Sequence, residues 1–285
     1  MYFSLAPNKL DVEVVLKTRP KNILVSYALW SKQNGKYKLK NIIKRFWDNN
    51  YYPNVMLDSG AYSFRDDRQE CSFLSLISPI VNDVYYNSDL SNEFKSYEDC
   101  LKYHIELVKD NELDIFYYEK LNEKLLSNYP NLLDYLDYIS INSKYIDCIV
   151  SLDDIYNGQS SIDNWYVIKC FFENAIPTFH FGEDLDILDY YINNKAAYIG
   201  LGGIAIAKKS KIPFKDIITW INNCSLRCAG IKTHLFGCQD NRILNKVDVT
   251  SADGASWIIT PSKKYKKLNK SKFELACEEI RRKEI

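Results

Sequence analysis

Short apolar runs alternate with amphipathic segments along most of the chain. The runs are nearly continuous in apolar residues, which is typical of strands buried on both faces of a parallel sheet. They predict strands at 22–30, 54–58, 146–154, 176–182, 197–203, 230–237 and 246–253. The amphipathic segments predict helices at 37–50, 96–111, 183–194, 213–223 and 271–282. Because the two kinds of segment alternate, we expect an α/β fold with a parallel sheet.

Local signals agree with several of these helices. Ser96 with Asp99, and Ser271 with Glu274, have the spacing of a capping box at a helix start. His104 lies on the apolar face of its segment, which predicts a packed core histidine rather than a ligand.

The number of strand–helix units favours one architecture over its alternative. A (β/α)8 TIM-like barrel typically needs about 250 residues, and the chain has 285. A doubly wound open sheet is the alternative. No stretch rich in Pro, Gly or Ser divides the chain, so we expect residues 1–285 to form a single barrel domain. The weakly patterned segment 64–100 predicts an insertion after the second strand.

Composition and targeting signals indicate an intracellular protein. Apolar residues make up 46% of the chain and charged residues 26%, as in globular proteins with a sizeable core. No apolar stretch approaches the ~18 residues of a membrane span, and the first residues do not resemble a signal peptide. We therefore expect a cytoplasmic location.

The charge balance is neutral, but the charges are unevenly placed. The 37 basic and 37 acidic residues cancel, which counts mildly against a nucleic-acid binder. One segment, KKYKKLNKSK at 263–272, is strongly basic and leads into the last predicted helix. Taken alone it is typical of a solvated connector. The alternative is a phosphate-contacting patch formed by Lys263, Lys264, Lys266 and Lys267.

The cysteines do not indicate a metal site. Eight are scattered along the chain, as expected of free thiols in a reducing compartment. Cys224, Cys228 and Cys238, with His234 between them, are the closest group. Their spacing contains no Cys-x-x-Cys pair, so we expect no cofactor, with a bound zinc as the alternative.

Several predicted strands end in residues that can carry chemistry. These ends are DSGAY at 58–62, Asp153-Asp154, HFG at 180–182, GLGG at 200–203, HLFG at 234–237 and Asp253-Gly254. In a parallel barrel the carboxyl ends of all strands meet on one face, where active sites form. A single Asp there is often only a helix N-cap, and GLGG alone can be a tight turn. Together they predict a site whose reactive groups are carboxylates, typical of chemistry at a glycosidic carbon.

Four of these strand ends resemble motifs of one enzyme family. DSGAYSF resembles the Asp-Ser-Gly-Gly-aromatic motif of the tRNA-guanine transglycosylases, and AYIGLGGIAIAK resembles their Gly-Gly-Leu-Ala-Val-Gly-Glu strand end. HLFGCQD and VDVTSADGASW occupy the places of their Met-Gly-Val-Gly and nucleophile segments. The compact chain is most similar to phage-type DNA 7-deazaguanine transglycosylases. The Lys-, Asn-, Ile- and Tyr-rich composition also suits an AT-rich phage genome.

The resemblance implies a (β/α)8 barrel that exchanges guanine for a 7-deazaguanine base through a covalent glycosyl-enzyme. Asp253 would be the nucleophile, with Asp248 as the alternative, and Asp58 the general acid/base. The implied base-binding residues are Ser59, Gly60, Tyr62, Asp153, His180, Gly202, Gly203 and His234. Among them, Tyr62 would stack on the purine, Asp153 and His180 would read its polar edge, and His234 would lie over the opposite ring face.

Two differences from the family shape the expected substrate. The family's Cys-x-Cys-x-x-Cys zinc motif is not present after residue 253, so DNA is favoured over tRNA as the polymer. Lys208 stands where bacterial tRNA enzymes have Glu, which favours a neutral base such as 7-cyano-7-deazaguanine. The alternatives are the same exchange on tRNA, a non-catalytic barrel that binds a nucleobase or nucleic acid, and a metal-dependent hydrolase. Because enzymes of this family often form dimers, the resemblance also implies a homodimer.

Overall fold

The computed structural model describes residues 1–60, 73–87, 92–109, 130–260 and 270–284. Its strands form one parallel sheet in the order β4-β3-β2-β1-β8-β7-β6-β5. The strands are β1 (Tyr2–Leu5), β2 (Asn22–Ser26), β3 (Asn54–Asp58), β4 (Cys148–Ile149), β5 (Thr178–His180), β6 (Tyr198–Gly202), β7 (Lys232–Leu235) and β8 (Ser251–Gly254). Every pairing within the sheet is parallel, so the expected α/β class with a parallel sheet is confirmed.

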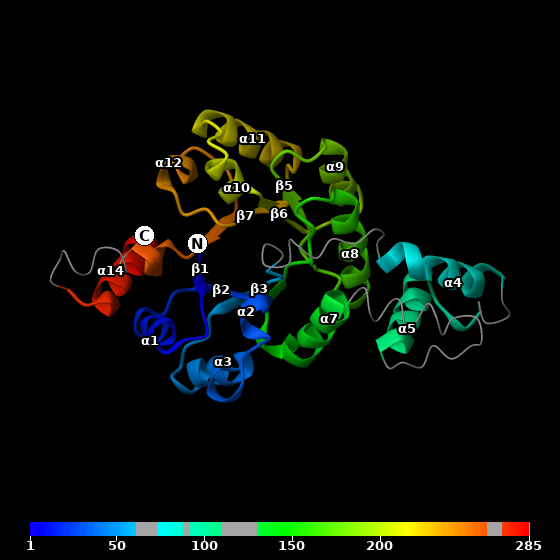
Figure 1. Cartoon of the computed structure of the whole chain (residues 1–285), viewed down its shortest axis with the longest axis horizontal. Helices are drawn as coiled ribbons and strands as arrows, with labels where there is room; N and C mark the ends of the chain where they lie inside the picture. The colour runs from blue at the N-terminus through cyan, green and yellow to red at the C-terminus, as the bar shows by residue number, and fades with distance from the viewer. Residues whose placement is uncertain (61–72, 88–91, 110–129, 261–269, 285) are drawn as a thin grey trace.

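The sheet is curled, and its edge strands approach each other (Figure 1). Just beyond β4 and before β5, Val150 and Ile176 form an isolated parallel bridge. The amide of Ser151 donates to the Ile176 carbonyl at 2.8 Å, and the Ile176 amide donates to the Ile149 carbonyl at 2.8 Å. The edges therefore meet at one bridge rather than along a full ladder.

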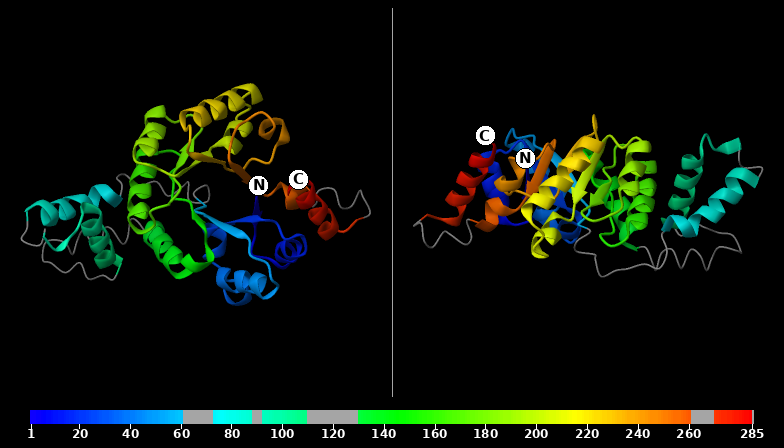
Figure 2. Two further views of the ribbon diagram at one scale, coloured as in Figure 1. Left: turned by 180° about the vertical axis from the view of Figure 1, so that it is seen from behind. Right: turned by 90° about the horizontal axis from the view of Figure 1, so that it is seen from above.

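Helices surround the outer face of this curled sheet (Figures 1 and 2). They include α1 (Lys9–Thr18), α3 (Leu39–Asp48), α7 (Pro130–Asn142), α8 (Gly158–Phe171), α9 (Leu185–Asn193), α11 (Phe214–Arg227) and α14 (Lys272–Glu284). The shorter helices are α2 (Tyr27–Trp30), α10 (Ile204–Lys209) and α12 (Asn241–Leu244). Each strand also lies beside its sequence neighbour, and β1 lies beside β8. A doubly wound sheet would instead carry helices on both faces and reverse its strand order.

Alternating side chains of the strands divide the core into two clusters. The larger one fills the space between sheet and helices and includes Phe3, Val25, Leu57, Phe179 and Leu201. The smaller one, formed by Tyr2, Leu24, Met56, Val150 and Ile176, lies on the opposite, concave face. Because side chains of a strand alternate between faces, the polar residues two positions further along several of these strands also point to the concave side.

Several predicted boundaries differ from the structure. The strand predicted at 22–30 ends at Ser26, and Tyr27–Trp30 form helix α2. The strand predicted at 146–154 is shorter: β4 has two residues, Val150 adds a single bridge, and Leu152 to Asp154 belong to the loop that follows. Strand β1 was not among the predictions, so the insertion follows the third strand rather than the second. It carries α4 (Phe73–Asn87) and α5 (Tyr97–Lys109), which project from one side (Figure 2).

Other local predictions are confirmed. The hydroxyl of Ser271 accepts from the Glu274 amide at 3.2 Å, and Glu274 accepts from the Ser271 amide at 2.8 Å, so α14 begins with a capping box. The Ser96 hydroxyl accepts from the Asp99 amide at 3.2 Å at the start of α5. His104 is buried on that helix. Among the described residues, no helix has the length and apolar character needed to cross a membrane.

Candidate active site

The carboxyl ends of the strands surround a cavity of about 280 Å³. Its lining includes six of the residues proposed from sequence, namely Asp58, Gly60, Asp153, His180, Gly202 and Gly203, together with the proposed nucleophile Asp253. Asp58, His180 and Gly202 are the last residues of their strands. The structure thus brings together residues that are up to 195 positions apart, as the parallel topology predicts.

Asp58 has the most perturbed acidity of the carboxyl groups in this cavity. Burial, followed by the negative charges of Asp153 and Asp253, raises its pKa to about 7. Hydrogen bonds from the Gly60 amide and the Ser26 side chain act in the opposite direction. A carboxyl group with this pKa exchanges a proton near neutral pH, as a general acid/base requires.

The turn after β3 depends on the glycine at position 60. Its φ is +75°, in the left-handed region. A Cβ there would lie 2.6 Å from the Ala28 Cβ and 2.7 Å from the Ser26 Oγ. Backbone conformation and lack of space therefore both require glycine, and the turn it makes directs its amide to Asp58.

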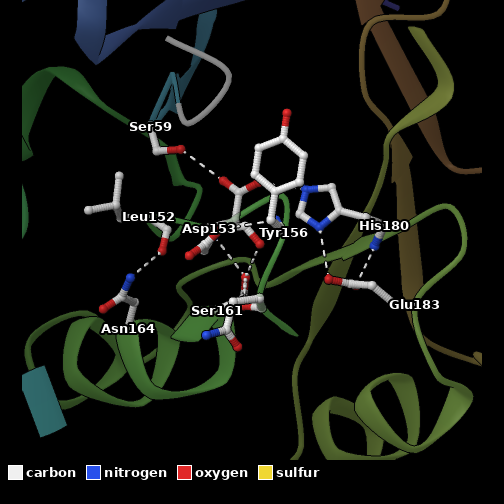
Figure 3. Close-up of polar contacts among 10 residues, drawn as sticks. Ser59, Leu152, Asp153, Tyr156, Ser161, Asn164, His180 and Glu183 are labelled. Carbon is white, nitrogen blue, oxygen red and sulfur yellow. Dashed lines mark hydrogen bonds and ion pairs between the residues drawn. The ribbon is translucent and has the colours of Figure 1, made fainter. Parts of the chain in front are cut away.

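Asp153 is held by two side chains from neighbouring strand ends (Figure 3). The Ser59 hydroxyl donates to its Oδ1 at 3.0 Å, and His180 Nε2 lies 2.7 Å from its Oδ2. Ser59 itself is fully buried and belongs to this support rather than to the cavity lining. Each carboxylate oxygen keeps a further lone pair for a ligand.

Both ring nitrogens of His180 contact carboxylate groups. Besides Asp153, its Nδ1 lies 3.3 Å from Glu183 Oε1, and its amide donates to Glu183 Oε2 at 2.7 Å (Figure 3). Burial lowers the pKa of the imidazole, but hydrogen bonds and charges of Asp153 and Glu183 outweigh it and raise the pKa to about 10. The ring is therefore an imidazolium at neutral pH with both N–H groups used within the protein. This arrangement leaves it no free ring donor with which to read a base.

Asp253 is fixed from three directions. The Ser4 hydroxyl donates to its Oδ2 at 2.9 Å, and the Gly237 amide donates to its Oδ1 at 2.7 Å. His234 Nε2 lies 3.3 Å from the same Oδ1. These contacts orient the carboxylate and restrict its rotation at the edge of the cavity.

His234 lies behind Asp253 and does not line the cavity. It is fully buried, and its Nδ1 shares a hydrogen bond with the Ser251 Oγ. The ring that does line the cavity is Phe236, in an edge contact with His234 at 4.5 Å between ring centroids. His234 and Phe236 lie two positions apart and so share the concave face of β7. His234 lies deeper, against Tyr2 and Tyr198, so Phe236 takes the place at the cavity that was expected of His234.

The glycine-rich end of β6 forms one wall. A Cβ on Gly202 would lie 2.7 Å from His180 Cδ2 and 2.9 Å from Thr178 Cγ2. Gly203 has a φ of +78° and caps α10, whose first residues Ile204, Ala205 and Ile206 continue the lining. This wall is apolar apart from its backbone.

The remaining proposed residues lie elsewhere. Asp248 is exposed before β8 begins, beside Asn222, and is not part of the cavity lining. Lys208 contacts Cys238 at 3.7 Å and Asp240 at 3.7 Å, so its charge is directed away from the lining. Tyr62 and the basic residues Lys263, Lys264, Lys266 and Lys267 lie outside the described residues.

Several residues of the site were not proposed from sequence. Ser4, Ser26, Thr178, Glu183 and Phe236 all support or line the cavity. For Ser4, Ser26 and Thr178 the available signal was strand alternation, since each lies two positions from a residue of the concave cluster. Glu183 carries no such signal, because it lies in the loop after β5.

Within the described segments, no group of three or more His, Cys, Asp or Glu side chains has the arrangement of a metal site. The three carboxylates, one imidazolium and the glycine wall form a site suited to acid–base and nucleophilic chemistry on a flat, polar-edged ligand. Neither a protein-family model nor a curated protein matches this chain.

Proposed function

We propose that this protein is a transglycosylase that replaces guanine in DNA with a 7-deazaguanine base through a covalent aspartyl intermediate. The observation that carries the proposal is that Asp58 and Asp253, from strands β3 and β8, line one cavity. Their surroundings differ as the two roles require. Asp58 has a pKa of about 7, whereas Asp253 accepts hydrogen bonds from Ser4 and Gly237.

In the proposed first step, the Asp253 carboxylate attacks C1′ of the nucleotide while the bond from C1′ to the base nitrogen breaks. Protonated Asp58 gives its proton to the departing guanine and becomes a carboxylate. In the second step Asp58 takes the N9 proton of the incoming 7-deazaguanine. That base then attacks C1′ and releases Asp253. The two displacements follow the logic of retaining glycosidases.

The base would be held by its polar edge and its flat faces. Asp153, held in place by the His180 ring, has lone pairs suited to the N1–H and 2-amino donors of guanine. Gly202 and Gly203 line the cavity without side chains, so a flat ring can approach their backbone. The apolar wall at Ile204 to Ile206 favours a neutral 7-substituent such as a nitrile. Lys208, directed away from this wall, takes no part in that preference.

The curled parallel sheet supports the further proposal that the domain is a (β/α)8 barrel of the transglycosylase type, with the edge bridge between Val150 and Ile176 as its closing point. DNA is the proposed polymer because the HLFG and SADGASW segments are most similar to those of phage-type DNA 7-deazaguanine transglycosylases. Reaching C1′ in a duplex would require extrusion of the nucleotide, so we expect single-stranded DNA to react faster.

The test is a base-exchange assay. Labelled guanine in DNA, or separately in tRNA, is incubated with the protein and 7-cyano-7-deazaguanine, with Asp253→Ala as control. We expect release of label from DNA by the native protein and none by the variant. Release from tRNA alone would keep the chemistry and reject the DNA assignment. Release from neither polymer would reject the proposed activity and leave a base-binding domain.

A further inference from the structure

A chain of hydrogen bonds leads from Asp253 across the concave face of the sheet to Tyr198. His234 Nε2 lies 3.3 Å from Asp253 Oδ1, and His234 Nδ1 lies 2.5 Å from the Ser251 Oγ. The Ser251 Oγ lies in turn 2.5 Å from the Tyr198 hydroxyl. Of these four side chains only Asp253 lines the cavity, so the other three form a support behind it.

The register of the sheet explains why these groups meet. His234 on β7 is paired with Ser251 on β8 and with Gly200 on β6. Gly200 presents no side chain to His234. Tyr198, two positions earlier on the same face of β6, makes an edge contact with the His234 ring at 6.3 Å between centroids. The Tyr198 hydroxyl thereby reaches Ser251, although β7 lies between their strands.

The direction of the hydrogen bonds follows from the donors and acceptors in the chain. As a carboxylate, Asp253 can only accept, so its contact with His234 requires a proton on Nε2. The Ser251 hydroxyl has one proton, which it gives to one of its two neighbours. If it donates to Nδ1, Tyr198 donates to Ser251 and every proton in the chain has an acceptor. The reverse direction needs a second proton on the ring and leaves the Tyr198 proton without an acceptor among the described residues.

We infer that Ser251 and Tyr198 are positioning residues, which hold the His234 ring in the tautomer with its proton on Nε2 and thereby fix the Asp253 carboxylate for attack. The inference rests on the proposed function, in which Asp253 is the nucleophile. His234 is fully buried, so its ring nitrogens depend on protein partners, and the partner of one nitrogen decides where the proton lies.

The same contacts distinguish the two oxygens of the Asp253 carboxylate. Oδ1 accepts from the Gly237 amide at 2.7 Å and from His234 Nε2. Oδ2 accepts from Ser4 alone among the described residues, at 2.9 Å. Oδ2 therefore keeps a lone pair for C1′, while two donors hold Oδ1 in place.

The experiment records long-range proton–nitrogen NMR spectra of the free protein, which distinguish a protonated from a bare ring nitrogen. The chain has three histidines, and His234→Phe assigns the signals of His234. Ser251→Ala removes the hydroxyl and Ser251→Thr keeps it, whereas Tyr198→Phe removes only the phenol oxygen. The matched control is Thr250→Val. Thr250 precedes Ser251 in the chain, and its hydroxyl accepts from the Thr233 amide at 3.1 Å.

We expect the native protein and Ser251→Thr to carry the ring proton on Nε2, and Ser251→Ala to show both tautomers. Tyr198→Phe should also show both, because Ser251 can then accept from Nδ1 as well as donate to it. In base exchange, Ser251→Ala should lower kcat about tenfold. Its KM for the incoming base should be unchanged, because no group that lines the cavity is altered. Thr250→Val should match the native protein in both measurements.

Three results would each overturn the inference and leave the proposed function intact. They are a native ring with its proton on Nδ1, a tautomer that Ser251→Ala leaves unchanged, and a kcat that Ser251→Ala leaves unchanged. A native protein that exchanges no base in DNA or tRNA would instead reject the proposed function, and the role at Asp253 would fall with it.

Discussion

Glu183 contacts His180 at two points, through the backbone amide and through the ring. Its Oε2 accepts from the His180 amide at 2.7 Å, and its Oε1 lies 3.3 Å from the ring Nδ1. The imidazole is therefore held between Glu183 and Asp153, and its pKa is raised to about 10. We interpret the contacts of His180 with Glu183 and Asp153 as the support that orients the Asp153 carboxyl group toward a ligand.

The first prediction concerns this pair. Since the folded-state pKa of His180 lies above its unfolded value, its contribution to stability is complete below about pH 6.5 and is lost as the pH rises toward 10. Glu183→Gln should lower that pKa, so base affinity should decline at a lower pH than in the native protein. NMR titration of the imidazole and calorimetry across pH 6–10 would measure both. Identical pH profiles would contradict the role of Glu183.

The second prediction separates the two candidate nucleophiles. Asp253→Asn should reduce exchange by at least about a thousandfold, as expected when a covalent nucleophile is removed. Asp248→Asn should retain full activity, because that residue is exposed away from the cavity. Mass spectrometry of the trapped glycosyl-enzyme would locate the modified residue. An adduct on Asp248 would exclude the proposed arrangement.

The third prediction concerns the acidity of Asp58. Its raised pKa means that the folded protein binds more protons than the unfolded chain between about pH 4 and 7, so stability should fall as the pH rises through that range. Asp58→Asn should remove this loss, so the free energy of unfolding at pH 8 should be roughly 2–4 kcal/mol higher than that of the native protein. The variant should not catalyse base exchange. Urea denaturation at pH 5 and pH 8 would test it. If the free energies of unfolding of Asp58→Asn and the native protein differed by the same amount at pH 5 and at pH 8, the raised pKa of Asp58 would be refuted.

The fourth prediction concerns the support of Asp253. His234→Phe keeps an aromatic ring within the same buried group but removes the contacts to Asp253 and Ser251. We expect kcat to fall by about 10- to 100-fold, of the size seen when a supporting group is lost, with base affinity unchanged. A matching loss of base affinity would instead place His234 in contact with the ligand, contrary to the structure.

Much of the fold follows from hydrophobic periodicity. Continuous apolar runs such as 54–58 and 197–203 predict buried parallel strands, and both are strands in the structure. Strand β1 is not predicted from periodicity because YFSL has only four residues and contains a serine. That serine belongs to the candidate site, since the Ser4 hydroxyl donates to Asp253. Polar residues on short strands weaken the apolar pattern that identifies them.

The sequence predicts those residues of the candidate site that lie at the ends of strands. Asp58, Asp153 and Asp253 follow apolar runs, and the topology brings them to one cavity. The sequence does not predict which of two nearby side chains on a strand lines the cavity. His234 and Phe236 share one face at the end of β7, and only their depth along the strand decides that Phe236 lines the cavity. Partners in loops, such as Glu183, depend on backbone geometry that no periodicity encodes.

Strand β1 lies beside β8, which is the last strand along the chain. Tyr2 is paired with Asp253, and the Ser4 hydroxyl donates a hydrogen bond to the Asp253 carboxylate. The hydrogen bond from Ser4 to Asp253 spans 249 positions in the chain. Contacts of this separation form late, since loop closure must precede them. A fragment of the chain that lacks either β1 or β8 therefore cannot form this pair of strands. The proposed nucleophile acquires the Ser4 hydroxyl only when both strands are in place, so neither strand carries an assembled site without the other.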